Sequence, residues 1–228
     1  MRLLAAVLTA GRAAPHRLCE LSVEMLQMSG AGISMLTPAG SRGTVCATDD
    51  RAARIEEVQM TMGVGPCIDA ITTGSPVLIA DTDRPGGVDV GRWAPLGDLA
   101  ASGVRALFAF PLRIGAITLG ALDFYRETPG GLEAEDLSRA LLAADVAGLT
   151  LLRLVAATDD VFAPDAAAGA DYRLEVHQAS GMVAVQLGVT VGEALLRLRA
   201  RAIAEGRSLA ELARDVVGRR VRFEVEDR

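Results

Sequence analysis

The chain has 228 residues, of which half are apolar and 23% are charged, and its formal net charge is −6. This composition favours one or two folded domains and excludes an intrinsically disordered protein. Because every basic residue is arginine, Schiff-base and P-loop mechanisms, which need a lysine, are excluded. With two histidines and three widely spaced cysteines, we expect no metal site, no cofactor and reduced thiols.

The first predicted element is an N-terminal helix at about residues 1–28, where apolar residues recur at helical spacing. The short apolar run at residues 3–10 also resembles a signal peptide. It lacks a clear cleavage site, so we favour the helix of a cytoplasmic protein. No stretch reaches the roughly 18 apolar residues of a membrane span, and we expect no membrane partner.

Short strands and helix-capping residues alternate over the next hundred residues. Strands are predicted at residues 32–37, 44–48 and 76–81 and in two runs joined at residues 113–115. Asp49 or Asp50 caps one helix, and Pro66 and Gly74 mark the start and the end of a second. Residues 92–103 are predicted to form a helix or a loop.

A long amphipathic helix at residues 132–154 closes this part of the chain. Hairpin-like strands with flanking helices, and without regular βαβ alternation, predict the α+β class with a mostly antiparallel sheet. We assign this domain to residues 1–154. Residues 155–171, rich in alanine, aspartate and glycine, are predicted to be a linker.

Residues 172–222 are predicted to form three helices, followed by a tail at residues 223–228. The boundaries are set by Gly188 and Gly206 as helix ends and by two capping boxes, Thr190–Glu193 and Ser208–Glu211. The predicted buried residues of the first two helices are Tyr172, Val176, Ala179, Val183 and Leu187, and then Val191, Ala194, Leu195, Leu198 and Ala202.

Charge is distributed unevenly between the two parts. Residues 170–228 carry ten arginines against nine acidic residues, whereas the rest of the chain is acidic. Within residues 172–222, nine arginines stand against five acidic residues. This mildly basic balance is compatible with a polyanionic partner. On the second predicted helix, Glu193, Arg197, Arg201 and Glu205 recur every four residues. They either form a solvated ladder of ion pairs or leave arginines to hold phosphates or bases.

Three motifs mark this helical region: "A-x-G-M" at residues 179–182, "EALLRLR" at 193–199 and "LAELARDVV" at 209–217. With these motifs the region resembles the ANTAR domain, a three-helix RNA-binding module of bacterial transcription antiterminators. It implies binding of paired RNA hairpins, whose loop bases can be unstacked and contacted. The implied RNA-binding residues are Gln178, Ser180, Gly181 and Arg199, to which the charge pattern adds Arg201 and Arg207.

Two of these positions have alternative interpretations. Many ANTAR domains carry lysine where this chain has Ser180, so a phosphate contact there is missing or comes from an arginine. Gly181 lies within a predicted helix, where glycine costs ~1 kcal/mol relative to alanine. It permits either close approach of RNA or close packing between helices.

The preceding region, about residues 16–154, contains "GVGPCIDAITTGSPVLIAD", "GVRALFAFPLRIGAITLGALDFYR" and the closing helix. With these segments it resembles a GAF domain, a small-molecule sensor fold, and "GPC-x-DA" is similar to GAF domains fused to ANTAR in actinobacteria. Together the resemblances imply a homodimeric antitermination regulator that is not an enzyme and responds to an unidentified small molecule or redox signal. The apolar faces of the first and closing helices would supply the dimer contact.

Three residues are candidates for the sensor pocket: Cys67, Asp69 and Trp93. Cys67, near a helix N-terminus, is either a redox-sensitive thiol with a lowered pKa or a small buried residue. Trp93, the single tryptophan, either lines the pocket or belongs to the core.

Two alternative functions are kept. In the first, the GAF-like domain is an enzyme resembling methionine sulfoxide reductases, with Cys46 and Cys67 as the thiol pair. In the second, the helical region binds a protein or DNA. Salt-dependent binding to hairpin RNA, without binding to duplex DNA, separates the RNA interpretation from the second alternative.

Overall fold

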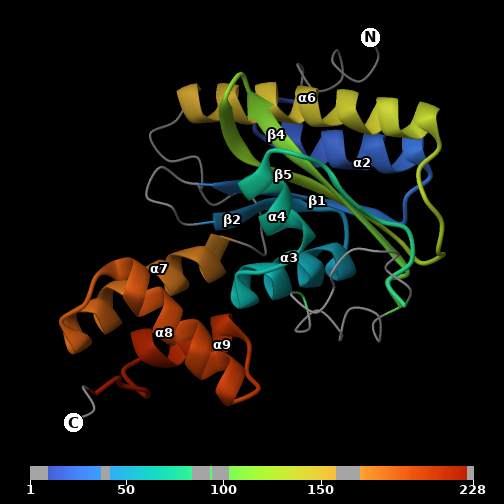
Figure 1. Ribbon diagram of the computed structural model, residues 1–228. Helices are drawn as coiled ribbons and strands as arrows, with labels where there is room; N and C mark the ends of the chain where they lie inside the picture. Colours follow the sequence, from blue (N-terminus) through green and yellow to red (C-terminus); the bar gives the residue numbers. More distant parts are fainter. Residues whose placement is uncertain (1–9, 37–41, 84–92, 94–102, 158–169, 225–228) are drawn as a thin grey trace. The chain divides into compact units, whose positions relative to one another are not determined.

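The computed structural model describes residues 10–36, 42–83, 93, 103–157 and 170–224 (Figure 1). The chain divides into two compact units, Met1–Ala163 and Pro164–Arg228, and each has its own hydrophobic core. The start of the first predicted helix, most of the predicted helix or loop at 92–103, and most of the predicted linker lie outside the described residues.

The first unit is built around a five-stranded sheet in which every neighbouring pair is antiparallel. The strand order is β2-β1-β5-β4-β3. The strands are β1 (Gly30–Leu36), β2 (Arg42–Ala47), β3 (Val77–Ile79), β4 (Ala106–Ile114) and β5 (Ile117–Arg126). The predicted α+β class and the predicted hairpin of β4 and β5, which turns at Gly115 with a φ of 61°, are confirmed.

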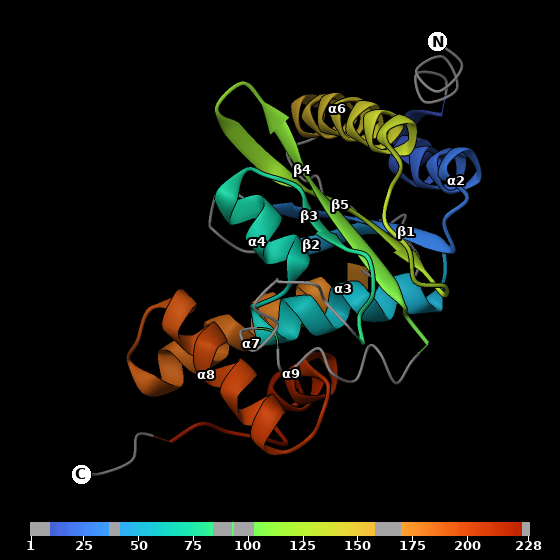
Figure 2. The same ribbon diagram turned by 45° about the vertical axis from the view of Figure 1, so that its right-hand side comes forward.

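Helices cover both faces of this sheet (Figures 1 and 2). The helices on one face are α2 (Ala14–Leu26), preceded by the 3-10 helix η1 (Gly11–Ala13), and α6 (Ala134–Ala157); those on the other are α3 (Asp50–Met62) and α4 (Pro66–Thr73). Successive strand residues point to opposite faces, so Ile33, Phe110 and Phe124 pack under α2 and α6. The residues at the alternate positions of these strands face α3 and α4.

The helices α3 and α4 begin and end at capping residues, several of which the sequence predicts. Asp49, rather than Asp50, caps α3, because its Oδ1 accepts a hydrogen bond from the Ala52 N–H at 2.9 Å. Pro66 begins α4, and Gly74 ends it in the left-handed conformation that glycine tolerates. Helix α6 continues to Ala157, three residues beyond its predicted end.

The second unit consists of α7 (Ala170–Leu187), α8 (Val191–Ala204) and α9 (Leu209–Val217). Both predicted capping boxes are present. The Glu193 N–H donates to Thr190 Oγ1 at 3.2 Å, and the Thr190 N–H donates to Glu193 Oε2 at 3.0 Å. Ser208 and Glu211 make the equivalent pair of bonds at 3.2 and 3.1 Å. The core of the unit contains Ala179, Val183, Ala194, Leu198, Ala202, Leu209, Leu212, Ala213 and Val216.

Two predictions for the second unit are wrong in detail. Val191, predicted to be buried, is 51% exposed, because it begins α8 one turn before Ala194, where burial starts. Phe223, predicted to begin a tail, packs against the core of the unit, and its N–H donates to Gln186 Oε1 at 2.9 Å.

In the described part of the chain, no single helix has the length and hydropathy of a membrane span. Segments of α7 and α8 pass that test only as a pair, and the pair is bent by 103°.

Candidate functional sites

Five polar residues form a buried cluster between the sheet and the helices α3 and α4. They are Ser34 on β1, Glu56 and Gln59 on α3, Cys67 on α4 and Asp123 on β5. All five are almost completely inaccessible to solvent. Ser34 and Asp123 are strand residues that point away from α2 and α6, so the alternation of the sheet carries them into this cluster.

Gln59 links three parts of the cluster. Its Nε2 donates to Asp123 Oδ2 at 3.1 Å, and its Oε1 accepts from the Cys67 backbone N–H at 2.8 Å. The Cys67 Sγ lies 3.0 Å from the Ser34 Oγ. One carboxylate oxygen of Glu56, one of Asp123 and the Cys67 sulfur all lie within 4.8 Å of one another.

Two glycines make room for the side chains of α3. A Cβ added to Gly32 would lie 2.9 Å from Glu56 Oε1, and one added to Gly65 would lie 2.6 Å from Gln59 Oε1. Gly65 also has a φ of 139°, which side-chain-bearing residues rarely adopt. Gly32 and Gly65 therefore allow the backbone to approach the two buried polar side chains of α3.

Burial controls the ionisation of the cluster. Removal from water raises the pKa of Glu56 well above its usual value, and the nearby Asp123 charge raises it further. Burial likewise raises the pKa of Asp123 to about 6. The pKa of the Cys67 thiol is also raised, first by burial and then by the charges of Asp123 and Glu56. A neutral thiol is the result, which favours the interpretation of Cys67 as a small buried residue over that of a redox-sensitive thiol with a lowered pKa.

The other two predicted pocket residues contact each other. The Trp93 Nε1–H donates to Asp69 Oδ2 at 2.9 Å. The Trp93 ring is buried and packs in a cluster that includes Ile55, Val104 and Tyr125, which supports its interpretation as a core residue. Asp69 lies two residues after Cys67 on the short helix α4.

The cysteines pair differently from the arrangement considered for an enzyme. The Cys46 Sγ lies 3.3 Å from the Sγ of Cys19 on α2. The Cys67 sulfur lies instead beside the Ser34 Oγ, at 3.0 Å, in the buried cluster. Cys46 and Cys67, the thiol pair of the enzyme alternative, therefore contact different partners.

In the second unit, the predicted RNA-binding residues of α7 lie in different environments. Gln178 is exposed. Ser180 is only 1% exposed, and its Oγ donates to the Val176 carbonyl at 2.7 Å. Ser180 therefore points into the unit, so its side chain is not placed to contact RNA as predicted. At Gly181, an added Cβ would meet no atom of the described residues within 4 Å, so close helix packing does not require this glycine.

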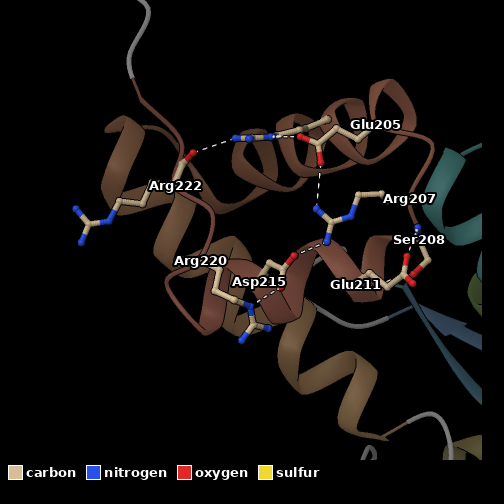
Figure 3. Close-up of polar contacts among 8 residues, drawn as sticks. Glu205, Arg207, Ser208, Glu211, Asp215, Arg220 and Arg222 are labelled. Carbon is tan, nitrogen blue, oxygen red and sulfur yellow. Dashed lines mark hydrogen bonds and ion pairs between the residues drawn. The ribbon is translucent and has the colours of Figure 1, made fainter.

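The predicted arginines of α8 and the following loop take part in an intramolecular network. Figure 3 shows Arg207 between Glu205 and Asp215, with which it forms ion pairs. Arg201 donates to Glu205 at 2.7 Å and to the Arg222 carbonyl at 2.9 Å. Its guanidinium also lies 5.0 Å from the centre of the Phe223 ring. Arg201 and Arg207 thus hold the C-terminal segment and α9 against α8. The third predicted arginine, Arg199, is half-buried on α8.

The buried cluster was not predicted, although its sequence contains a signal. Glu56 and Gln59 share one face of α3 with the buried residues Ala52 and Ile55, and two polar residues on an apolar helical face need a partner inside the protein. Asp123 likewise interrupts the apolar strand β5. Taken together, the polar residues on the apolar face of α3 and within the apolar strand β5 indicate a buried polar site.

Comparison with known proteins identifies the first unit. The family model described as "GAF domain" matches residues 16–151, more than half of the chain. The match ends before the helical unit, and the ANTAR resemblance has no family-model match. No curated protein matches the chain.

Solved structures show the same fold for the first unit. The GAF domain of an Acinetobacter phosphoenolpyruvate-protein phosphotransferase has a TM-score of 0.57 at 8% identity and covers 69% of this chain and 92% of its own. The corresponding domain from Coxiella burnetii has a TM-score of 0.54 at 11% identity, covering 68% and 92%. A segment of a methyl-accepting chemotaxis protein has a TM-score of 0.53 at 15% identity, covering 69% and 99%.

Proposed function

We propose, from the premise that the chain belongs to the GAF domain family, that it is a signal-responsive RNA-binding regulator of transcription antitermination. GAF domains typically sense small molecules in signalling proteins. In this proposal the first unit receives a small-molecule or redox signal, and the helical unit binds paired RNA hairpins in the cytoplasm. The proposal contains no catalytic step.

The observation that carries the RNA proposal is the exposed face of α7. Gln178, Gly181 and Val185 lie at positions i, i+3 and i+7, which share one side of a helix. Val185 is 85% exposed, the highest value among the large hydrophobic side chains of the described residues. Glycine has a low helix propensity, and no packing contact among the described residues requires a glycine at position 181. This face offers a side-chain amide, a stretch of backbone that no side chain of its own residue covers, and an apolar side chain. Such groups can contact the unstacked bases of an RNA loop.

The arginines divide between folding and binding in this account. Arg201 and Arg207 are assigned to the intramolecular network shown in Figure 3. Arg197, which is exposed on α8, and Arg199 are assigned to phosphates or bases. Of the six predicted RNA-binding residues, the proposal keeps Gln178, Gly181 and Arg199, leaves out Ser180, Arg201 and Arg207, and adds the exposed Arg197.

A second copy of the chain is the proposed partner of α6. This helix exposes a group of large apolar side chains, which are Leu141, Leu142, Leu149, Leu152 and Val155. Leu142, Leu149 and Leu152 follow one another at steps of seven and three, the spacing of a helix-to-helix seam. Burial of this face in a homodimer would supply two helical units for two RNA hairpins.

The experiment is a titration of the full chain with three nucleic acids at several stated salt concentrations. The three are an RNA with two hairpins and matched loops, the same RNA with scrambled loops, and duplex DNA. We expect preferential binding to the first RNA, with affinity falling as salt rises. Equal binding to all three, or stronger binding to duplex DNA, would contradict the proposal.

A further inference from the structure

We propose that Glu56, Cys67 and Asp123 form a binding site for a divalent first-row transition-metal ion such as Zn²⁺. The site lies inside the GAF unit, where three separate elements supply one ligand each: α3, α4 and β5. This inference is independent of the RNA-binding proposal.

The geometry of the three ligand atoms is close to that of a metal site. The two carboxylate oxygens and the sulfur lie within 4.8 Å of one another. In a tetrahedral zinc site, the ligand atoms are about 3.3–3.8 Å apart, as follows from Zn–O and Zn–S bonds of about 2.0–2.3 Å. Side-chain shifts of about 1 Å bring the three atoms into that geometry around an ion.

Asp123 Oδ2 accepts a hydrogen bond from Gln59, but the other three oxygens of the two buried carboxylates, Asp123 Oδ1 and both oxygens of Glu56, lack a donor of normal geometry among the described residues. Hydrogen bonding with Asp123 and Ser34 is nevertheless among the causes that shift the pKa of Glu56. Glu56 is only 1% exposed, so its carboxylate is directed into the cluster and away from solvent. An unpaired buried carboxylate is costly unless a cation or a proton neutralises it. The described groups that shift the pKa of Glu56 and Asp123 include no cation.

The surroundings hold the ligands in place. Gly32 leaves the space that the Glu56 carboxylate occupies, since an added Cβ would lie 2.9 Å from Glu56 Oε1. Gln59 donates to the Asp123 oxygen Oδ2 at 3.1 Å and so leaves Oδ1 for the ion. Hydrogen bonds of this kind orient metal ligands and contribute to metal affinity.

The donor atoms identify the class of ion. Calcium and magnesium take oxygen ligands, whereas a sulfur donor selects a softer ion. Thiolate sulfur and carboxylate oxygen are both ligand types of Zn²⁺, and three protein ligands leave the fourth position open to water or a small ligand. Binding requires the Cys67 thiol to lose its proton to solvent.

A proton provides the competing explanation of the cluster. If Glu56 and Asp123 share one proton, the pair carries a single charge and needs no metal. The two explanations differ in what added metal does. An ion bound only by the folded protein stabilises it by an amount that rises with the logarithm of the ion concentration above the dissociation constant, whereas a proton-sharing pair gives no response to Zn²⁺.

The test uses the full chain after removal of metal by a chelator and measures Zn²⁺ binding by calorimetry. We expect one Zn²⁺ per chain and a thermal unfolding midpoint that rises with Zn²⁺ concentration. Glu56→Gln should weaken binding by at least ~100-fold, since even indirect supports of a metal ligand contribute 10–100-fold. The matched control is Glu57→Gln, the next residue of α3, whose carboxylate pairs with Arg54 outside the cluster and which should bind like wild type.

Cobalt supplies a second readout that does not depend on stability. Bound Co²⁺ should give a thiolate-to-metal charge-transfer band, which Cys67→Ser or Cys67→Ala removes and Cys46→Ser leaves unchanged. Absence of a band in the folded wild-type protein overturns the proposal. So does Zn²⁺ binding that survives both Glu56→Gln and Cys67→Ser, because the ion is then bound elsewhere.

Discussion

The sulfur atoms of Cys19 and Cys46 lie 3.3 Å apart and connect helix α2 to strand β2. Cys19 is buried, and its pKa is raised by its hydrogen bond with Cys46 and by burial, whereas Cys46 is partly accessible. Cys46 is therefore the thiol that reacts first with an oxidant.

Hydrogen peroxide should join Cys19 and Cys46 in a disulfide. Peroxide oxidises Cys46 to a sulfenic acid and becomes water, and the Cys19 thiol then displaces a second water to form the S–S bond. Peptide mapping should show the Cys19–Cys46 link and a free Cys67, and Cys46→Ser should show neither this link nor another. A Cys46–Cys67 link would contradict the structure and favour the thiol pair of the enzyme alternative.

Gly181→Ala should separate folding from RNA binding. Alanine is favoured over glycine within a helix by ~1 kcal/mol, and the added methyl group meets no described atom within 4 Å, so the helical unit should become more stable. The same methyl group should weaken RNA binding if RNA approaches the backbone there. Thermal unfolding and RNA titration measure the two effects, with Gly192→Ala on α8 as the control. Unchanged RNA affinity in Gly181→Ala would remove this residue from the interface.

The Arg207 network should make the helical unit sensitive to acid. Hydrogen bonds from arginine lower the pKa of Asp215 and of Glu205, with Arg207 the main cause for Asp215 and Arg201 for Glu205. A lowered folded-state pKa stabilises the unit above the unfolded-state pKa, and that stability is lost as pH falls through the folded value. The unfolding midpoint of the wild type should therefore fall below pH ~4.

Arg207→Gln tests the origin of this acid sensitivity. This variant should be less stable than the wild type at pH 7, and the difference should shrink as the pH falls below about 4, where the carboxylates become protonated. Arg197→Gln removes the same charge from an exposed position and serves as the control. A difference that is constant from pH 7 to pH 3 would show that the ion pairs do not stabilise the fold.

The exposed apolar face of α6 should determine the oligomeric state. Leu149→Asp places a charge in the middle of this face, and burying an unpaired charge in a dimer is unfavourable. Light scattering should show a dimer for the wild type and a monomer for Leu149→Asp. Ile117→Asp, which changes an exposed residue of β5, should remain dimeric. A wild-type monomer, free and with RNA, would contradict the dimer.

Local signals predicted much of the fold. Pro66, Gly74 and the two capping boxes act within a few residues along the chain, so the sequence alone contains their effect on helix boundaries. The hairpin of β4 and β5 has the same origin, since its two apolar runs are joined by a short turn.

The buried cluster and the thiol pair could not be predicted in this way because their members come together only in the folded chain. Gln59 and Asp123 are 64 residues apart, and Cys19 and Cys46 are 27 residues apart. Ser180 shows a related difficulty. A family resemblance assigns a position to a function, but only the packing of α7 shows that this side chain points inward.

The proposed binding of paired RNA hairpins by the exposed face of α7 is tested by the dissociation constant of the full chain for a two-hairpin RNA with matched loops. Wild type and Gln178→Ala are compared at one stated salt concentration. We expect tight binding by the wild type and a weakening of ~1–3 kcal/mol in Gln178→Ala, the range of a base contact. Equal affinity of the two proteins, or equal affinity of the wild type for an RNA with scrambled loops, would contradict the proposed binding.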